Sequence, residues 1–479
     1  MSLLVRIIFL GAFFGLLFSC GDEGMLLDTL NMLNTANSGK IALVKVPHPI
    51  ARMLGQKQRF TPEYLQHPVY AVGYVEEETL NRLPRTIRDQ VSFLNERAWA
   101  TGDFDREALM PTSDPDPNAM YEGYHNYDQL SKELERLSQK YPDKIRLETA
   151  GKSVKGRELW YVVVSDRVHE NEHEPKFIFH ANMHGDEVVG RELMIYFIRY
   201  LMEKYGSDSR ITQLVDNSEI FVMPSMNPDG FENASRGNAR GRDLNRDLPD
   251  RFTLPNDTPE GHEIEVQRIM KLAQDNHFVL GMNWHGGEIC FNLPWGNISN
   301  ANPEDKYWDD AMFYPIGREY TQFNKTMYQN HQDNFDHGLT YGYEWYPVNG
   351  GINDWFNYFR RSIHAVVELS TNKWPDSSTL DNYWNDNREA MITYLWRGLR
   401  GVHLEIRDEA GALVLKPTIA IASAPKRQMP FDSGYVHRLS SDGLQSVTIT
   451  AEGFAIKRVE IEASYFSGKY EKVTLKKKL

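Results

Sequence analysis

The chain has 479 residues, of which 41% are hydrophobic and 25% are charged. This length exceeds one ordinary domain and this composition is typical of soluble globular proteins, so we expect two or three domains. The formal net charge of −13 argues against nucleic acid as a partner, because phosphate binding requires clustered Lys and Arg.

The first twenty residues have the pattern of an export signal. One positive charge, Arg6, precedes the apolar run Ile7–Phe18, which is too short for a comfortable membrane span. The sequence Leu17-Phe18-Ser19-Cys20 resembles a bacterial lipobox, although Phe18 stands where a smaller residue is usual. We therefore predict a signal peptide over residues 1–19 and a lipoprotein anchored through Cys20, facing the periplasm or the cell exterior. A plain cleaved signal or an uncleaved anchor is the alternative.

Residues 20–118 form a region of unknown role that ends in a linker. Ile41–Val46 and Val69–Val75 have the pattern of strands, and Glu76–Leu94 has that of a helix. The proline-rich run Pro111–Pro117 indicates the linker. These elements predict a small α/β module, which is either an inhibitory or docking segment for the region that follows or a spacer at the cell surface.

Residues 119–398 alternate strand patterns with helical ones. A helix is predicted over Tyr127–Tyr141, after Glu187, and around His262–Asp275 and Tyr314–His331. Short apolar runs between them are typical of strands buried in a parallel sheet. These runs are Leu159–Val164, Phe177–His180, Ile220–Pro224, Phe278–Trp284 and His364–Leu369. The alternation predicts an α/β fold with one central, mostly parallel sheet flanked by helices.

Three candidate metal ligands fall where these strands end. His184 and Glu187 are three residues apart at a strand-to-helix corner, so both side chains can point at one ion. His285 follows another strand and precedes two glycines, which allow a sharp turn. Functional groups gather at the carboxyl ends of parallel strands, and two histidines with one glutamate leave the fourth position of zinc open for water. The pattern predicts one Zn²⁺ per chain.

Six motifs occur in the order found in the funnelin (M14) zinc metallocarboxypeptidases, and the chain resembles that family from Tyr121 to its C-terminus. The motifs are His184-Gly185-Asp186-Glu187, Asn227-Pro228-Asp229-Gly230, Asp243-Leu244-Asn245-Arg246-Asp247, His285-Gly286-Gly287, Tyr346 shortly before Gly350-Gly351, and Glu368-Leu369-Ser370. The carboxypeptidase N/E branch is the most similar. The resemblance implies a zinc exopeptidase that acts on peptide or protein C-termini, and we expect a monomer.

The resemblance implies roles for the residues around the metal. His184, Glu187 and His285 hold zinc. Glu368 is the general base, which takes a proton from zinc-bound water and hands it to the leaving amine. Arg236 polarises the scissile carbonyl and stabilises the oxyanion.

A second set of matching residues contacts the substrate or supports the metal ligands. Asn245 and Arg246 match the pair that binds the terminal carboxylate, Arg246 through a two-pronged contact. Tyr346 matches a mobile tyrosine that closes over the bound C-terminus. Asp243 matches a carboxylate that orients His184.

The residues expected to receive the substrate side chain depart from the branch, whose members favour C-terminal Lys or Arg. Their acidic residue corresponds to Gly296 and their glutamine to Asn353. The expected lining is Asn292, Gly296, Val348 and Asn353. No carboxylate among these four can pair with a buried cation, so we predict a neutral C-terminal side chain. Glu288, from a neighbouring position, keeps the question open.

Residues 399–479 alternate short strands with turns, which predicts a small all-β sandwich. The expected strands are Val402–Ile406, Ala412–Leu415, Thr418–Ile421, Tyr435–Arg438, Val447–Thr450 and Val459–Glu462. In the N/E branch the peptidase is likewise followed by a transthyretin-like domain, and we expect the same here, with a structural role.

Two other functions stay open. An enzyme of the same fold could use the zinc chemistry on cell-wall peptides or another amide. A catalytically silent module could bind peptide termini only, but the complete ligand set and Glu368 count against it, because binding alone needs no base.

Overall fold

The computed structural model describes residues 41–56, 61–64, 70–93, 123–297, 307–331 and 335–478. The predicted signal peptide, Cys20 and the linker Pro111–Pro117 lie outside these ranges. The chain divides into two compact units, Met1–Asn95 and Glu96–Leu479. Within the described ranges, no helix has the length and apolar character needed to cross a membrane.

The N-terminal unit contains a four-stranded sheet in the order β2-β3-β1-β4. Its elements are β1 (Ile41–Pro47), α3 (His48–Gln56), β2 (Thr61–Tyr64), β3 (Tyr70–Glu76), α4 (Glu77–Arg82), α5 (Arg85–Arg88) and β4 (Ser92–Phe93). The two strands predicted here are confirmed. The single helix predicted over Glu76–Leu94 is wrong, because Pro84 lacks an N–H and disfavours helical geometry at Leu83, so α4 and α5 are separate.

The second unit is built on an eight-stranded sheet in the order β11-β10-β12-β9-β7-β8-β6-β5. Its strands are β5 (Ile145–Lys152), β6 (Glu158–Val164), β7 (Lys176–Ala181), β8 (Glu219–Met223), β9 (Phe278–His285), β10 (Ile289–Leu293), β11 (Leu339–Tyr341) and β12 (Ile363–Leu369). The central strands β12, β9, β7 and β8 run parallel, while β6 and β10 pair antiparallel with their inner neighbours. The predicted mostly parallel α/β sheet is confirmed.

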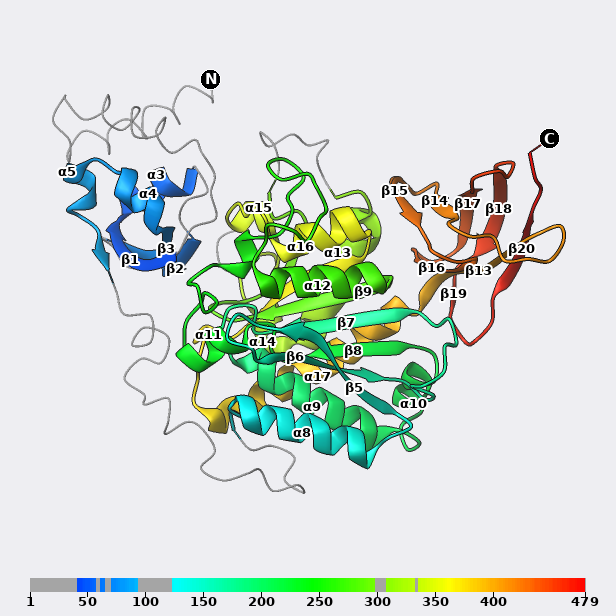
Figure 1. Cartoon of the computed structure of the whole chain (residues 1–479), viewed down its shortest axis with the longest axis horizontal. Coiled ribbons are helices and arrows are strands. Elements are labelled where there is room, and N and C mark those ends of the chain that lie inside the picture. The colour runs from blue at the N-terminus through cyan, green and yellow to red at the C-terminus, as the bar shows by residue number, and fades with distance from the viewer. Residues whose placement is uncertain are drawn as a thin grey trace. The chain divides into compact units, whose positions relative to one another are not determined.

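Helices cover both faces of this sheet (Figure 1). The longer ones are α8 (Tyr127–Lys140), α9 (Val189–Lys204), α10 (Ser209–Val215), α12 (Ile264–Asp275), α13 (Asp310–Phe323) and α17 (Leu380–Gly398). Successive residues of β7 enter different apolar clusters: Phe177 and Phe179 pack with α9 and α17, whereas Ile178 packs with α12. This alternation is the two-residue period of a strand buried on both faces.

Short helices lie in the connections between these elements. They are α11 (Pro228–Asn233), η1 (Leu244–Arg246), α14 (Lys325–Tyr328), α15 (Gly342–Trp345), α16 (Ile352–Trp355), η3 (Phe356–Arg360) and η4 (Ser377–Thr379). The helical stretch predicted around Tyr314–His331 is two helices. Asn324 ends α13, and its side chain accepts the Met327 N–H to cap α14.

The C-terminal part folds as two four-stranded sheets, which confirms the predicted all-β region (Figure 1). The strands are β13 (Arg400–Asp408), β14 (Thr418–Ile421), β15 (Ala424–Pro430), β16 (Tyr435–Leu439), β17 (Leu444–Thr450), β18 (Lys457–Glu462), β19 (Ser464–Tyr465) and β20 (Glu471–Leu475). Both sheets contribute to one apolar cluster, with Ile406 from β13 and Ile419 from β14. The strand predicted over Ala412–Leu415 is wrong: the Asp408 carboxylate accepts the Ala412 N–H, and this local turn leaves only an isolated bridge at Leu413.

Candidate metal centre and active site

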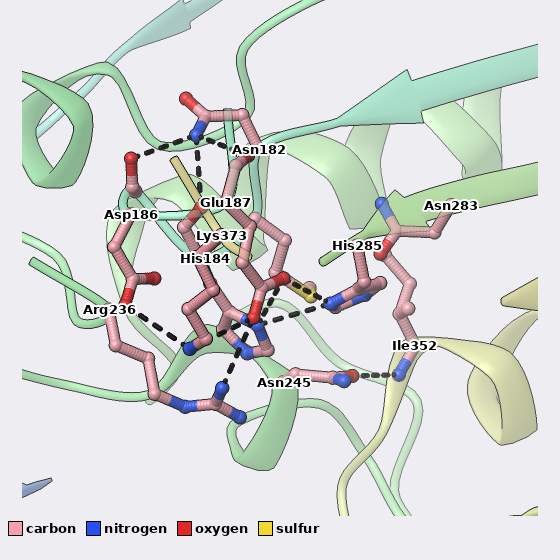
Figure 2. A network of polar contacts seen from close by, with 12 residues as sticks. Asn182, His184, Asp186, Glu187, Arg236, Asn245, Asn283, His285, Ile352 and Lys373 are labelled. Atoms are coloured by element: carbon pink, nitrogen blue, oxygen red, sulfur yellow. Dashed lines mark hydrogen bonds and ion pairs between the residues drawn. The ribbon is translucent and has the colours of Figure 1, made fainter. Parts of the chain in front are cut away.

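The loop after β7 holds two of the predicted ligands in a fixed conformation. Asn182 has a φ of 55°, and its side-chain amide donates to the carbonyl oxygens of His184, Gly185 and Glu187 at 2.9, 3.1 and 3.2 Å (Figure 2). A Cβ on Gly185 would lie 2.0 Å from the carbonyl carbon of Gly230, so no larger residue fits there. Only glycine therefore fits at this position of the first motif. The loop presents His184 and Glu187 on the same side.

The three predicted ligands converge on one point (Figure 2). His184 Nδ1 lies 2.9 Å from Glu187 Oε2, His285 Nδ1 lies 2.8 Å from the same oxygen, and the two nitrogens are 3.1 Å apart. Ligand atoms about 2.05 Å from a tetrahedral zinc are about 3.3 Å apart, so these separations fit a zinc ion. All three residues are buried. The donor set of two imidazole nitrogens and one carboxylate suits zinc.

Asp243 and Arg236 orient the first histidine. His184 Nε2 lies 3.1 Å from Asp243 Oδ1, and Arg236 Nε donates to Asp243 Oδ2 at 3.0 Å. Burial alone would raise the pKa of Asp243, but Arg236 and His184 hold this pKa well below its usual range. The ionised carboxylate accepts the Nε2–H of His184, so the Nδ1 lone pair faces Glu187 and His285. The structure thus brings Asp243, predicted to orient His184, and Arg236, predicted to polarise the scissile carbonyl, to the ligand cluster.

Lys373 is a member of this network that the sequence analysis missed. Its Nζ lies 3.2 Å from Asp186 Oδ2 and 3.3 Å from Glu187 Oε1, and only 5% of the lysine is exposed. Burial opposes ionisation of Glu187, yet His184, Lys373 and His285 hold its pKa well below the usual range. No local periodicity marks Lys373. The one indication in the sequence is that Asp186 and Glu187, if both are buried, require a nearby cation.

Strand pairing places the predicted base beside the ligands. Glu368, the last but one residue of β12, lies directly opposite His285 on the parallel strand β9 and opposite Cys290 on β10. It is 7% exposed. Burial, followed by the charges of Glu368 and Glu288, raises the pKa of the Cys290 thiol well above its usual value, so Cys290 remains a neutral apolar neighbour.

The two residues predicted to bind the terminal carboxylate both lie on η1. Asn245 Oδ1 accepts the N–H of Ile352 at 2.9 Å (Figure 2), and Arg246 Nη1 donates to the Asn245 carbonyl at 2.8 Å. The first bond ties η1 to the start of α16. Tyr346 follows α15, is partly buried, and packs edge-on against Trp345 with ring centroids 4.7 Å apart.

The four residues expected to receive the substrate side chain are brought together from distant parts of the chain. Val348 N–H donates to the Gly296 carbonyl at 2.9 Å, and Asn353 Nδ2 donates to the Asn292 carbonyl at 3.3 Å. Glu288 is held elsewhere: its Oε1 accepts the Ile289 N–H at 2.9 Å and Asn330 Nδ2 at 3.3 Å.

A buried carboxylate beside these four residues was also missed. Asp354 Oδ1 accepts the Gly296 N–H at 2.6 Å. Asp354 directly follows Asn353, but no local pattern links it to Gly296, because the contact spans 58 residues.

The site and the fold agree with the comparisons to known proteins. Residues 130–390 match the zinc carboxypeptidase family. Human carboxypeptidase D is 36% identical over 354 residues, which cover 69% of this chain and 25% of that protein. Mouse carboxypeptidase M is 34% identical over 352 residues, which cover 69% of this chain and 78% of that protein. The chain belongs to the zinc carboxypeptidase family.

Solved structures support the same fold. Carboxypeptidase A from Helicoverpa armigera superposes with a TM-score of 0.54 at 15% sequence identity, covering 75% of this chain and 98% of that one. The match spans about a quarter of the length of carboxypeptidase D. Family membership implies zinc as the metal, and the donor set of His184, Glu187 and His285 fits it.

Proposed function

We propose that this protein is a zinc-dependent exopeptidase that hydrolyses the C-terminal peptide bond of peptides. The observation that carries the proposal is the convergence of His184 Nδ1, Glu187 Oε2 and His285 Nδ1, with Glu368 next to His285 in register. Its relatives include proteins named carboxypeptidase D and carboxypeptidase M, in accord with this activity.

The chain supplies the metal site and the proton transfer. His184, Glu187 and His285 would hold zinc, which would supply Lewis-acid chemistry by making a bound water more acidic and polarising the scissile carbonyl. Glu368 accepts a proton from the attacking water and delivers it to the nitrogen of the departing residue, so the carboxylate is regenerated in each cycle. Arg236 is fixed by Asp243 and lies 3.4 Å from Glu187, which places its positive charge next to the ligands, where the oxyanion develops.

Recognition of a free C-terminus is assigned to η1. Arg246 provides a guanidinium that pairs with a carboxylate through two hydrogen bonds, and Asn245 lies beside it. Tyr346 is the residue proposed to close over the bound terminus. An amidated C-terminus lacks the negative charge and should be a poor substrate.

For the substrate's last side chain we propose a neutral residue. Asn292, Gly296, Val348 and Asn353 carry no charge, and Glu288 is engaged by Asn330. Export, lipid anchoring at Cys20, a monomeric state and a transthyretin-like fold of residues 399–479 remain part of the proposal.

Mass spectrometry of a mixed peptide library tests this function. Wild type should release single C-terminal residues from free-acid peptides and leave amidated peptides intact, and Glu368→Gln should release none. If zinc is bound and no ordinary peptide is cleaved, the proposal is wrong, and cell-wall peptides or binding without catalysis become the explanations.

A further inference from the structure

Five residues form what we call the Gly296 cluster: Asn292, Gly296, Val348, Asn353 and Asp354. The cluster is joined to the proposed carboxylate-binding residues. A Cβ on Gly351 would lie 2.9 Å from Val348 Cγ1 and 3.5 Å from Asn245 Oδ1. A substrate whose terminal carboxylate lies at Asn245 and Arg246 therefore has its last side chain next to the Gly296 cluster.

Two buried acceptor oxygens in this cluster have no hydrogen-bond partner among the described residues. They are Asp354 Oδ2 and Asn292 Oδ1. The Asn297 N–H lowers the pKa of Asp354 but does not reach Oδ2 with hydrogen-bond geometry. Asp354 is only 5% exposed, and its other oxygen already accepts the Gly296 N–H. Buried polar atoms are almost always hydrogen-bonded, and leaving one without a partner is unfavourable. A ligand that brings donors to this place would satisfy both oxygens.

The Asp354 carboxylate and Asn292 Oδ1 lie close to Gly296. A Cβ added to Gly296 would be 3.5 Å from Asp354 Oδ1 and 3.5 Å from Val348 Cβ. A Cβ on Gly342 would be 2.7 Å from the Gly296 Cα and 3.2 Å from Asn292 Oδ1. Any side chain at position 296 would lie against the Asp354 carboxylate. Because Gly296 has no side chain, a substrate side chain can occupy this space.

Charged groups around Asp354 set its protonation. Burial raises the pKa of Asp354 to about 7; the Gly296 and Asn297 N–H groups and Arg251 act against this rise, while Asp250 adds to it. Arg251 itself stacks over Trp295 at 4.1 Å and donates to the Asn297 carbonyl at 2.6 Å. Near neutral pH the carboxyl is present in both forms.

We propose that Asp354 is a specificity-determining residue, and that it selects C-terminal residues whose side chains end in hydrogen-bond donors. The inference rests on the proposed carboxypeptidase function. When Asp354 is protonated, its O–H donates to the oxygen of a side-chain amide, and Asn292 Oδ1 accepts from the amide nitrogen. When Asp354 is ionised, its Oδ2 and Asn292 Oδ1 both accept hydrogen bonds from the cationic side chain of Lys or Arg. The preference for a neutral C-terminal side chain, proposed above, thus belongs to the protonated form of Asp354.

The test uses peptides that differ only in a C-terminal Gln, Lys or Met, with kcat/KM measured from pH 5.5 to 8.5. Because a hydrogen bond to a charged group is worth more than a neutral one, the Lys:Met ratio should rise about tenfold across pH 7, and Gln should exceed Met below it. In Asp354→Asn, which keeps an acceptor for the Gly296 N–H, the Lys:Met ratio should be low at every pH. Glu288→Gln, a nearby carboxylate outside the cluster, should behave as wild type.

A Lys:Met ratio that does not change with pH in wild type, or that keeps its pH dependence in Asp354→Asn, would show that Asp354 only anchors the loop at Gly296. If Asp354→Asn does not fold, the pH dependence in wild type decides. If no peptide is cleaved, the proposed function fails, and binding of the same peptides to Glu368→Gln by calorimetry still tests the inference: Lys should gain affinity over Met as the pH rises.

Discussion

Replacing Lys373 with methionine should destabilise the metal-free protein strongly. The substitution removes the ammonium that lies 3.2 Å from Asp186 and 3.3 Å from Glu187, whose exposures are 0% and 4%. Removing one partner of a buried ion pair costs about 3 to 5 kcal/mol. Arg236 stays 3.4 Å from Glu187 in the variant, so we expect a loss at the lower end of this range. With an unfolding entropy of about 2.1 cal/mol/K per residue, a loss of about 3 kcal/mol lowers the Tm of this larger unit by about 4 °C.

Differential scanning calorimetry of chelator-treated protein measures this change. Lys271→Met is the matched control, because Lys271 pairs with Asp275 on the surface of α12 and exposed pairs contribute about 0 to 1 kcal/mol. Added zinc should reduce the difference in Tm between Lys373→Met and wild type, since the ion compensates the charge of Glu187. The difference should not vanish, because zinc does not compensate the charge of Asp186. A fall in Tm no larger than that of Lys271→Met would refute the reasoning.

Three further predictions concern the site and its surroundings. Asp243→Asn should weaken zinc binding about 10- to 100-fold, measured by competition with a chelator, because the carboxylate that orients His184 is lost; unchanged affinity would contradict this role. Gly185→Ala should abolish stoichiometric zinc binding, measured by metal analysis of the purified protein, because its Cβ would overlap Gly230; a fully loaded variant would exclude the steric argument. Burial and neighbouring acidic groups raise the pKa of Glu174 from 4.5 to about 8, so this group favours the folded state less as pH rises from about 4.5 to 8. Denaturant unfolding should therefore show a smaller loss of stability over that range in Glu174→Gln than in wild type, and identical pH profiles would argue against it.

Much of the fold was readable from local patterns. Runs such as Phe177–Phe179 and Phe278–Met282 are continuously apolar because their strands are buried on both faces. The strand ends also identified the ligands, since His184 and His285 follow such runs. Apolar periodicity failed where a single residue decided the local conformation. Pro84 interrupts a helical pattern, and the Asp408 side chain stabilises a turn.

Residue identity and short-range spacing were enough to give the chemical types of the ligands, their order along the chain and the class of fold. The distant groups that complete the site became visible in the folded chain. Lys373 contacts Asp186 across 187 positions, and Asp354 contacts Gly296 across 58. The requirement for such partners arises from burial, and burial is created by the order in which β7, β9 and β12 pair, which no local pattern encodes.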